Sequence, residues 1–170
     1  MFYLIRHGES DYSEKGTKIY RGFGENLAPL TLNGIKQIKK TAQDTRLKSA
    51  QIIISSPYTR AVQTAAIISK ELQIDIVIET DLHEWLANKN YYFEENNIVE
   101  TYCKEFNDYN GEYPEGTTRD WENNDMMKDR IFSVLNKYKK YDSVIVVCHG
   151  MLIYSTSNHW TKNGEIVEVI

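Results

Sequence analysis

The feature that most constrains the fold is a series of short apolar runs, separated by longer stretches in which apolar residues recur every three or four positions. The clearest run, residues 144–147, consists of four consecutive valine and isoleucine residues, which is typical of a strand buried on both faces of a parallel sheet. The runs predict strands over residues 2–5, 51–55, 74–78 and 143–148, and an edge strand over 165–170, where polar and apolar positions mix.

The stretches between the first runs predict two helices with recognisable starts. Thr31 is a suitable N-cap for one helix, and Ser56 for the next, with Pro57 at its first position. Their buried faces would consist of Ile35, Ile38 and Ala42 in the first helix and Ala61, Ala65, Ile68 and Leu72 in the second. Strand, helix and strand in this order predict an α/β fold with a mostly parallel sheet.

Residues 86–120 are the least regular part of the chain. One amphipathic helical face is formed there by Ile98, Val99, Tyr102, Cys103 and Phe106. Around it lie Tyr91, Tyr92, Phe93, Tyr109 and Tyr113. These aromatic side chains could belong to the core or line a lid over a pocket, and we expect most of them to belong to the core. A further helix is predicted from Trp121 to about Tyr138, capped by Asp120 or Thr118. A length of 170 residues predicts one domain over 1–170, with 86–120 as a variable excursion.

The composition argues against several classes of protein. A formal net charge of −4 disfavours a broad surface for nucleic acid or for an anionic membrane. Two cysteines, Cys103 and Cys148, form neither a disulfide framework nor a zinc-ligand spacing, and His83-Glu84 lacks the second histidine of a zinc helix motif, because position 87 is alanine. No apolar run approaches the ~18 residues of a membrane span, so we expect a cytoplasmic protein.

Arginine and histidine side chains follow the ends of two predicted strands. Arg6 and His7 follow the first, His149 follows the fourth, and each histidine precedes a glycine. Because parallel strands direct their carboxyl ends to one edge of a sheet, these residues are expected to meet. Arg60 lies in the first turn of a predicted helix, where a cation is disfavoured unless an anion lies nearby.

Taken singly, these residues also have simpler interpretations: a surface pair for Arg6 and His7, and an arginine that extends into solvent for Arg60. Glu84 follows a further strand and could reach the same edge, although a lone acid is usually solvated. Together, two arginines and two histidines would form a pocket for phosphate, whose oxygens guanidinium groups bind bidentately. A carboxyl group beside it could protonate a leaving oxygen.

The segment from Asp11 to Ala28 is polar, contains Gly16, Gly22 and Gly24, and predicts a long loop. Arg21 is its most interesting cation. A solvated arginine and a phosphate contact are equally compatible with its sequence context.

Taken in order, these residues resemble the histidine phosphatase superfamily, the phosphoglycerate mutase-like enzymes. Leu4-Ile5-Arg6-His7-Gly8-Glu9-Ser10 is similar to the RHG signature of that family. The other matching segments are Pro29-Leu30-Thr31 with Gly34 and Gln37, Ser55-Ser56-Pro57 with Arg60, Ala61, Gln63, Thr64 and Ala65, Leu82 to Trp85, and Val146 to Gly150. The resemblance implies a three-layer sandwich, with a mostly parallel central sheet and helices on both faces.

The resemblance also implies roles for individual residues. His7 would attack phosphorus to give a phosphohistidine, with its other ring nitrogen held by a backbone carbonyl. Arg6, Arg60 and His149 would hold the phosphate oxygens, and Glu84 would donate a proton to the leaving oxygen and then activate water. No metal or cofactor is implied. The candidate substrate contacts are Ser13, in the region where many members carry an asparagine, Arg21 and Gly150.

The resemblance favours a metal-independent phosphomonoester hydrolase that acts on a small phosphorylated metabolite, as a monomer or homodimer. A phosphoglycerate mutase ranks second, because it would have to exclude water and usually carries longer insertions. A phosphoprotein phosphatase is a third alternative, favoured by a shallow site. The non-enzyme alternative is a phosphate-binding module without turnover, which would gain support if Glu84 pointed away from His7.

Overall fold

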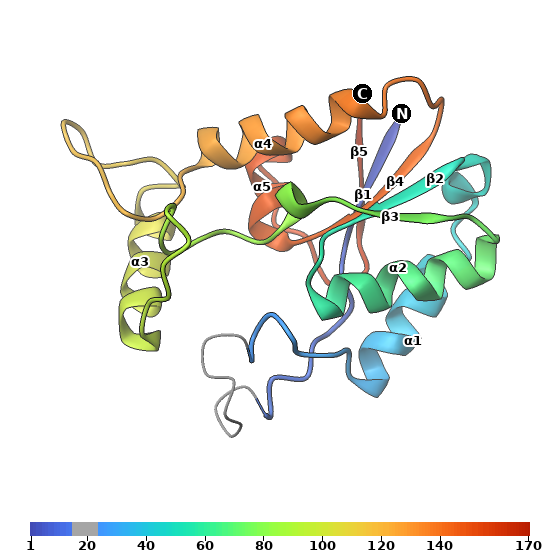
Figure 1. Cartoon of the computed structure of the whole chain (residues 1–170), viewed down its shortest axis with the longest axis horizontal. Coiled ribbons are helices and arrows are strands. Elements are labelled where there is room, and N and C mark those ends of the chain that lie inside the picture. The colour runs from blue at the N-terminus through green and yellow to red at the C-terminus, as the bar shows by residue number, and fades with distance from the viewer. Residues whose placement is uncertain (15–23) are drawn as a thin grey trace.

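The structure is a computed structural model that describes residues 1–14 and 24–170. Its centre is a sheet of five strands in the order β3-β2-β4-β1-β5 (Figure 1). β1 (Phe2–Arg6), β2 (Ile52–Ser55), β3 (Ile76–Ile78) and β4 (Val144–Cys148) are parallel, and β5 (Ile166–Val169) pairs antiparallel with β1 at one edge. The predicted α/β fold with a mostly parallel sheet is therefore confirmed.

Helices cover both faces of the sheet. α1 (Leu32–Thr41) and α2 (Thr59–Leu72) lie on one face, and α4 (Asn124–Lys137) and α5 (Gly150–Ser157) on the other (Figure 1). α3 (Asn96–Asp108) projects beyond the sheet, and short 3-10 turns, η1 (Thr45–Ser49) and η2 (Thr80–Leu82), complete the set. In the described parts of the chain, no helix is both long and apolar enough to cross a membrane.

Alternate residues of the central strands point to opposite faces of the sheet, and each set packs against its own helices. Ile5, Ile53 and Ile145 form one core with residues of α1 and α2, including Ile38 and Ala65. On the other face, the core residues are Leu4, Ile54, Val144 and Val146 with Ile131, Val134 and Leu135 of α4. Central strands buried on both faces explain their continuous apolar sequences.

Two helices begin later than the sequence predicts. α2 begins at Thr59 rather than Pro57. The Ser56 hydroxyl accepts a 3.3 Å hydrogen bond from the Tyr58 N–H in the turn before the helix, and it also makes a 2.7 Å hydrogen bond with Nε2 of His149. α4 begins at Asn124 rather than Trp121, because Asn123 caps it by accepting a 3.0 Å hydrogen bond from the Met126 N–H. In both places a short side chain bonds a backbone N–H near the helix start, and the helix begins later than the cap signal in the sequence predicts.

The prediction that most aromatic residues of the excursion are core was wrong. Tyr91, Tyr92, Phe93 and Tyr109 are 66%, 73%, 55% and 48% exposed, and only Tyr113 is half-buried, with its ring centroid 4.8 Å from that of Trp121. The excursion lies outside the sheet, and its helix α3 contributes one fully buried residue, Phe106, so few of its side chains reach the core.

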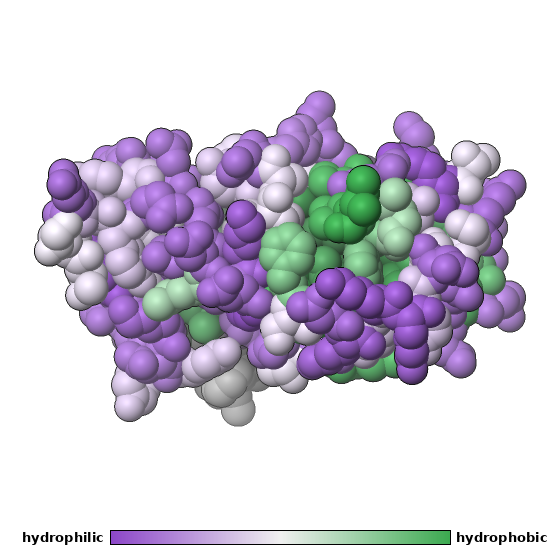
Figure 2. Space-filling view, turned by 90° about the horizontal axis from the view of Figure 1, so that it is seen from above, coloured by the Kyte–Doolittle hydropathy of each residue, from purple (hydrophilic) through white to green (hydrophobic). Residues whose placement is uncertain are grey.

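The surface reflects this arrangement. Figure 2 views the face on which both chain ends lie, and there apolar residues gather over the end of the sheet. The half that contains α3 is mostly hydrophilic in the same view. The outer surface of the excursion is thus largely polar, while Phe106 packs inside against Trp85 and Trp121.

Candidate active site

The register of two neighbouring strands brings His7 and His149 together. Arg6, the last residue of β1, is paired with Cys148, the last residue of β4. The next residue of each strand is a histidine, and the two ring centroids are 5.1 Å apart. The predicted meeting of the two strand ends is confirmed, across 142 residues of sequence.

The protonation state of His7 follows from its two hydrogen bonds. Its Nδ1 lies 2.8 Å from the carbonyl oxygen of Gly8, and its Nε2 lies 3.2 Å from Nε of Arg60. A guanidinium group can only donate, so Nε2 must carry the lone pair and Nδ1 the proton. Burial and then the charge of Arg60 lower the pKa of His7 to about 3, although the Gly8 carbonyl acts in the opposite direction. His7 is therefore neutral, with a lone pair on Nε2.

Residues distant in sequence fix the backbone around His7. Asn163, in the turn before β5, donates from its side chain to the carbonyl oxygen of His7 at 2.9 Å, and Gly8 donates to the Thr64 hydroxyl at 3.2 Å. Thr64 belongs to the motif that carries Arg60, so the sequence offered a signal for it. Asn163 lies outside every matching motif, and sequence reasoning missed it.

Arg60 is buried, with 3% of its surface exposed, and lies in the first turn of α2 as predicted. Its Nη1 donates to the carbonyl oxygen of Glu25 at 2.9 Å, and its guanidinium lies 5.0 Å from the ring centroid of Tyr58. The first N–H of the helix, that of Thr59, donates to Asn26. The positive charge beside Nε2 of His7 is therefore supplied by the Arg60 side chain.

Two further nitrogens in the cluster are buried without a partner in the described part of the chain: Nε of Arg6 and Nδ1 of His149. Arg6 also donates from Nη1 to the carbonyl oxygen of Thr161, and Gly150 leaves room for its guanidinium, since a Cβ there would lie 3.2 Å from Cζ. Burial and the charge of Arg60 lower the pKa of His149 well below its ordinary value. An anion with several oxygen acceptors fits this shortage of partners.

Glu84 lies in the loop that follows η2 and is half-buried. Its Oε1 accepts a 2.9 Å hydrogen bond from the Trp85 N–H, and it has no hydrogen bond with His7 or Arg60. The pKa of Tyr58 is raised mainly by burial, but also by the charge of Glu84, and the Tyr58 ring lies 5.2 Å from that of His149. Glu84 therefore lies within electrostatic range of Tyr58, whose ring contacts that of His149.

The structure does not bring Ser13 to the cluster. Ser13 is exposed, and its backbone N–H donates to Asp11 at 2.9 Å. Hydrogen bonds from Ser13 lower the pKa of Asp11. The hydroxyl that lies near His7 is that of Ser10, 3.4 Å from Nδ1. Arg21 lies outside the described residues.

The described residues contain no group of three or more histidine, cysteine, aspartate and glutamate side chains placed to hold a metal ion. Positive charge in the cluster comes from Arg6 and Arg60. The arrangement can therefore bind an anion and present the Nε2 lone pair of His7 to it.

A mostly parallel sheet with histidines at the ends of two adjacent strands, a half-buried Arg6 and a buried Arg60 beside them define the class of protein. The chain belongs to the histidine phosphatase superfamily, branch 1, which it matches over residues 2–166. Its members are phosphatases or mutases.

Particular relatives agree with this assignment. The chain is 28% identical over 155 residues to the uncharacterized phosphatase PhoE of Bacillus subtilis (strain 168), which covers 89% of this chain and 72% of the relative. It resembles a mycobacterial glucosyl-3-phosphoglycerate phosphatase with a TM-score of 0.66 and 18% identity, over 92% of this chain and 76% of the other. A phosphoglycerate mutase from Bacillus anthracis str. Sterne gives a TM-score of 0.65 and 18% identity, over 97% and 85%. At these identities the two structural likenesses establish the fold.

Proposed function

We propose that this protein is a phosphomonoester hydrolase that acts on a small phosphorylated metabolite through a covalent phosphohistidine at His7. The observation that carries the proposal is the neutral imidazole of His7, with Nδ1–H bonded to the Gly8 carbonyl and a lone pair on Nε2. A histidine can attack phosphorus only from an unprotonated nitrogen. Its low pKa keeps that nitrogen unprotonated across the neutral range.

In the first step, Nε2 of His7 forms a bond to phosphorus while the bond from phosphorus to the ester oxygen breaks. Glu84 gives its proton to the departing oxygen, so that an alcohol leaves. In the free protein Nε–H of Arg60 donates a hydrogen bond to Nε2 of His7. As the substrate binds, this N–H must exchange that hydrogen bond for one to a phosphate oxygen. Substrate binding would therefore release the lone pair and engage the guanidinium in the same movement.

The charge that spreads over the phosphoryl oxygens in the transition state would be bound by Arg6, Arg60 and His149. The unpartnered Nε of Arg6 and Nδ1 of His149 are the atoms available for this purpose. In the second step, the Glu84 carboxylate takes a proton from water, the water oxygen attacks phosphorus, and the bond between phosphorus and Nε2 breaks. Inorganic phosphate leaves, and His7 regains its lone pair.

The substrate class rests on family membership and on the relative named as a phosphatase. PhoE of Bacillus subtilis matches most of this chain and is named as a phosphatase, without a stated substrate. The mycobacterial glucosyl-3-phosphoglycerate phosphatase is similar to this chain only in fold, so the substrate of that enzyme is not assigned to this chain. The proposal accordingly extends to a small phosphate ester and no further.

The test is hydrolysis of an aryl phosphate by the purified protein in the presence of a chelator. The wild type should release phosphate, and His7→Ala should abolish release, because the attacking nitrogen is lost. After an acid-labile, base-stable phosphoenzyme is trapped by quenching, its label should map to His7. His159→Ala is the matched control, since His159 is an exposed histidine bonded to Glu165, and it should retain full activity.

Three outcomes would contradict the proposal: activity in His7→Ala, a strict requirement for a divalent ion, or transfer between phosphoglycerates that outpaces release of phosphate. The last would indicate a mutase instead.

A further inference from the structure

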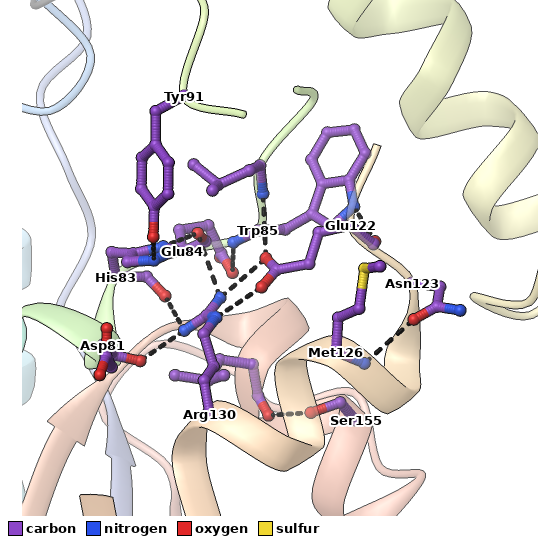
Figure 3. Close-up of polar contacts among 12 residues, drawn as sticks. Asp81, His83, Glu84, Trp85, Tyr91, Glu122, Asn123, Met126, Arg130 and Ser155 are labelled. Carbon is purple, nitrogen blue, oxygen red and sulfur yellow. Dashed lines mark hydrogen bonds and ion pairs between the residues drawn. The ribbon is translucent and has the colours of Figure 1, made fainter. Parts of the chain in front are cut away.

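The loop that carries Glu84 is held by one side chain from another element. Arg130, on α4, donates from Nη1 to the carbonyl oxygens of Asp81 at 2.6 Å and His83 at 2.9 Å (Figure 3). Its Nη2 donates to the carbonyl oxygen of Glu84 at 3.4 Å. Three carbonyls within four residues of the loop therefore accept from a single guanidinium group, and the Glu84 carbonyl oxygen also lies 2.7 Å from Nδ1 of His83.

The remaining donors of Arg130 bind a buried carboxylate. Its Nε donates to Oε1 of Glu122 at 2.6 Å and its Nη2 to Oε2 at 2.9 Å, and the two side chains are only 12% and 7% exposed. All five N–H donors of the guanidinium are thus used, two on Glu122 and three on the loop. A lysine has three donors and no planar fork, so it could not reproduce this set.

Glu122 also binds the end of the same loop. Its Oε2 accepts from the Leu86 N–H at 3.3 Å, its own N–H donates to the Leu86 carbonyl oxygen at 2.9 Å, and its carbonyl oxygen accepts from Nε1 of Trp85 at 2.7 Å. Figure 3 shows Glu122 and Arg130 between the loop and α4. The loop is clamped both before and after Glu84.

The cost of this arrangement indicates a purpose beyond stability. Burying a carboxylate and a guanidinium requires the loss of their hydration, and apolar side chains of similar volume often stabilise a fold as well or better. What an apolar pair could not do is fix the backbone of residues 81–86 through directed hydrogen bonds. The Glu84 carboxylate extends from this fixed backbone and is itself bonded to the Trp85 N–H.

We propose that Arg130 and Glu122 are positioning residues that hold Glu84 at the distance and angle needed for proton transfer to the leaving oxygen. This inference rests on the proposed function, in which Glu84 is the general acid. General acid catalysis contributes roughly 10²- to 10⁴-fold and requires hydrogen-bond geometry, so a loosened loop should lose part of it. The loss depends on the substrate, because a poor leaving group needs the proton more than a good one.

The experiment compares kcat/KM for 4-nitrophenyl phosphate, which has a good leaving group, with that for an alkyl phosphate, which has a poor one. Arg130→Met should lower kcat/KM for the alkyl ester about tenfold more than for the aryl ester, a fraction of the general acid contribution. Glu122→Gln should shift the same ratio in the same direction. Glu84→Gln should shift it most, and adding Arg130→Met to Glu84→Gln should shift it no further, because both changes act through one carboxyl group.

The matched control is Arg119→Met. Arg119 makes a 2.8 Å ion pair with Glu105 in the same part of the molecule, at 30% and 24% exposure, and neither side chain bonds to residues 81–86. It should leave the ratio of the two substrates unchanged, whatever it does to stability. Arg130→Lys, which keeps the charge but supplies fewer donors, serves if Arg130→Met does not fold, and it should give a smaller shift of the ratio.

The outcomes separate this inference from the function on which it rests. If Glu84→Gln shifts the ratio and the folded variants of Arg130 and Glu122 do not, the positioning role is overturned while the proposed acid stands. If Glu84→Gln leaves the ratio unchanged, the acid role of Glu84 in the proposed function fails, and the positioning role with it. A shift in Arg119→Met equal to that in Arg130→Met would reduce the effect to general loosening and overturn the inference.

Discussion

The hydrogen bond between Arg60 and His7 links substrate binding to the activation of the nucleophile. Without an anion, Nε of Arg60 donates to the lone pair that would attack phosphorus. Phosphate oxygens are stronger acceptors for a guanidinium group than a neutral imidazole nitrogen, because they carry charge. The same arginine therefore covers the nucleophile in the free protein and binds the transferring group in the proposed complex.

A second close contact at the scale of single residues involves Gly150 and Arg6. A Cβ on Gly150 would lie 3.2 Å from Cζ and 3.3 Å from Nε of Arg6, so the guanidinium would have to move by a few tenths of an ångström. Alanine at the first position of α5 is also a better helix former than glycine, by up to about 1 kcal/mol. Gly150→Ala should therefore keep or raise Tm while lowering kcat/KM for an aryl phosphate, roughly tenfold, through misplacement of Arg6.

Thermal unfolding and steady-state kinetics on the same preparation check this prediction. Unchanged kcat/KM in Gly150→Ala would show that Arg6 tolerates the added methyl group. A fall in both Tm and activity would point to a folding defect instead of a displaced guanidinium.

The sequence could predict Arg6, His7 and His149 as neighbours because strand ends in a parallel sheet share an edge, and the register of β1 with β4 makes them so. It could not predict Asn163, whose hydrogen bond to His7 spans 156 residues and belongs to no repeating pattern. The contact between Ser13 and substrate stays a prediction; in this structure Ser13 is exposed and its backbone N–H donates to Asp11.

At the scale of elements, the N-terminus of α1 forms a support for the chain that follows His7. Gly34 lies so close to this chain that a Cβ on it would be 2.2 Å from the carbonyl oxygen of Glu9. Thr31 caps the helix by accepting from the Gly34 N–H at 2.9 Å, and Gln37 accepts from the Glu9 N–H at 2.9 Å. These contacts give a physical reason for the threonine, glycine and glutamine spacing noted in the sequence.

Gly34→Ala should lower both stability and activity. A methyl group at this position meets backbone atoms, which cannot rotate away, so either α1 or the chain after His7 must move. Overpacking of this kind typically costs roughly 1–3 kcal/mol. Urea unfolding should show that loss, with Lys36→Ala, an exposed change on the same helix, within about 0.5 kcal/mol of wild type. Equal midpoints for Gly34→Ala and wild type would contradict the contact.

The sequence predicted that α2 and α4 exist, but placed their first residues two and three positions too early. A serine followed by proline satisfies the usual rules for a helix start, and Ser56 does accept from the Tyr58 N–H, but its hydroxyl also bonds His149 and the helix begins only at Thr59. Trp121 was included in the predicted helix although it is fully buried and its Nε1 donates to Glu105. Tertiary hydrogen bonds decide such helix boundaries, and helix propensity, which depends on local sequence, carries no information about them.

At the scale of the whole molecule, the central sheet and the excursion differ in what determines them. The strands are set by apolar runs and by register, both of which can be read from the sequence. The excursion is attached through contacts such as those of Glu122 with Leu86 and of Asn124 with Asn110 and Gly111, and its aromatic residues largely remain exposed. Its position could not be predicted, because polar contacts between irregular segments leave no periodic signal.

Three buried histidines should make the folded state sensitive to acid. Burial is the largest cause that lowers the pKa of His7, His149 and His83, and for His7 the value falls to about 3. In the unfolded chain, histidine titrates near about 6.5. Between these values the unfolded state binds more protons than the folded state, so stability rises with pH, and it is lost as pH falls below the unfolded pKa.

Urea unfolding at pH 7 and pH 5 tests this linkage, in a window above the range where most carboxylates titrate. Wild type should be less stable at pH 5. His7 alone should account for about 2 kcal/mol of the difference, because pH 5 lies about 1.5 units below the unfolded pKa and each unit corresponds to about 1.4 kcal/mol. His7→Asn removes that titration and should reduce the difference by about this amount. His159→Gln, at an exposed histidine, should retain most of it. Equal pH dependence in wild type and His7→Asn would mean that His7 accepts a proton in the folded state, and the neutral nucleophile would then lose its structural basis.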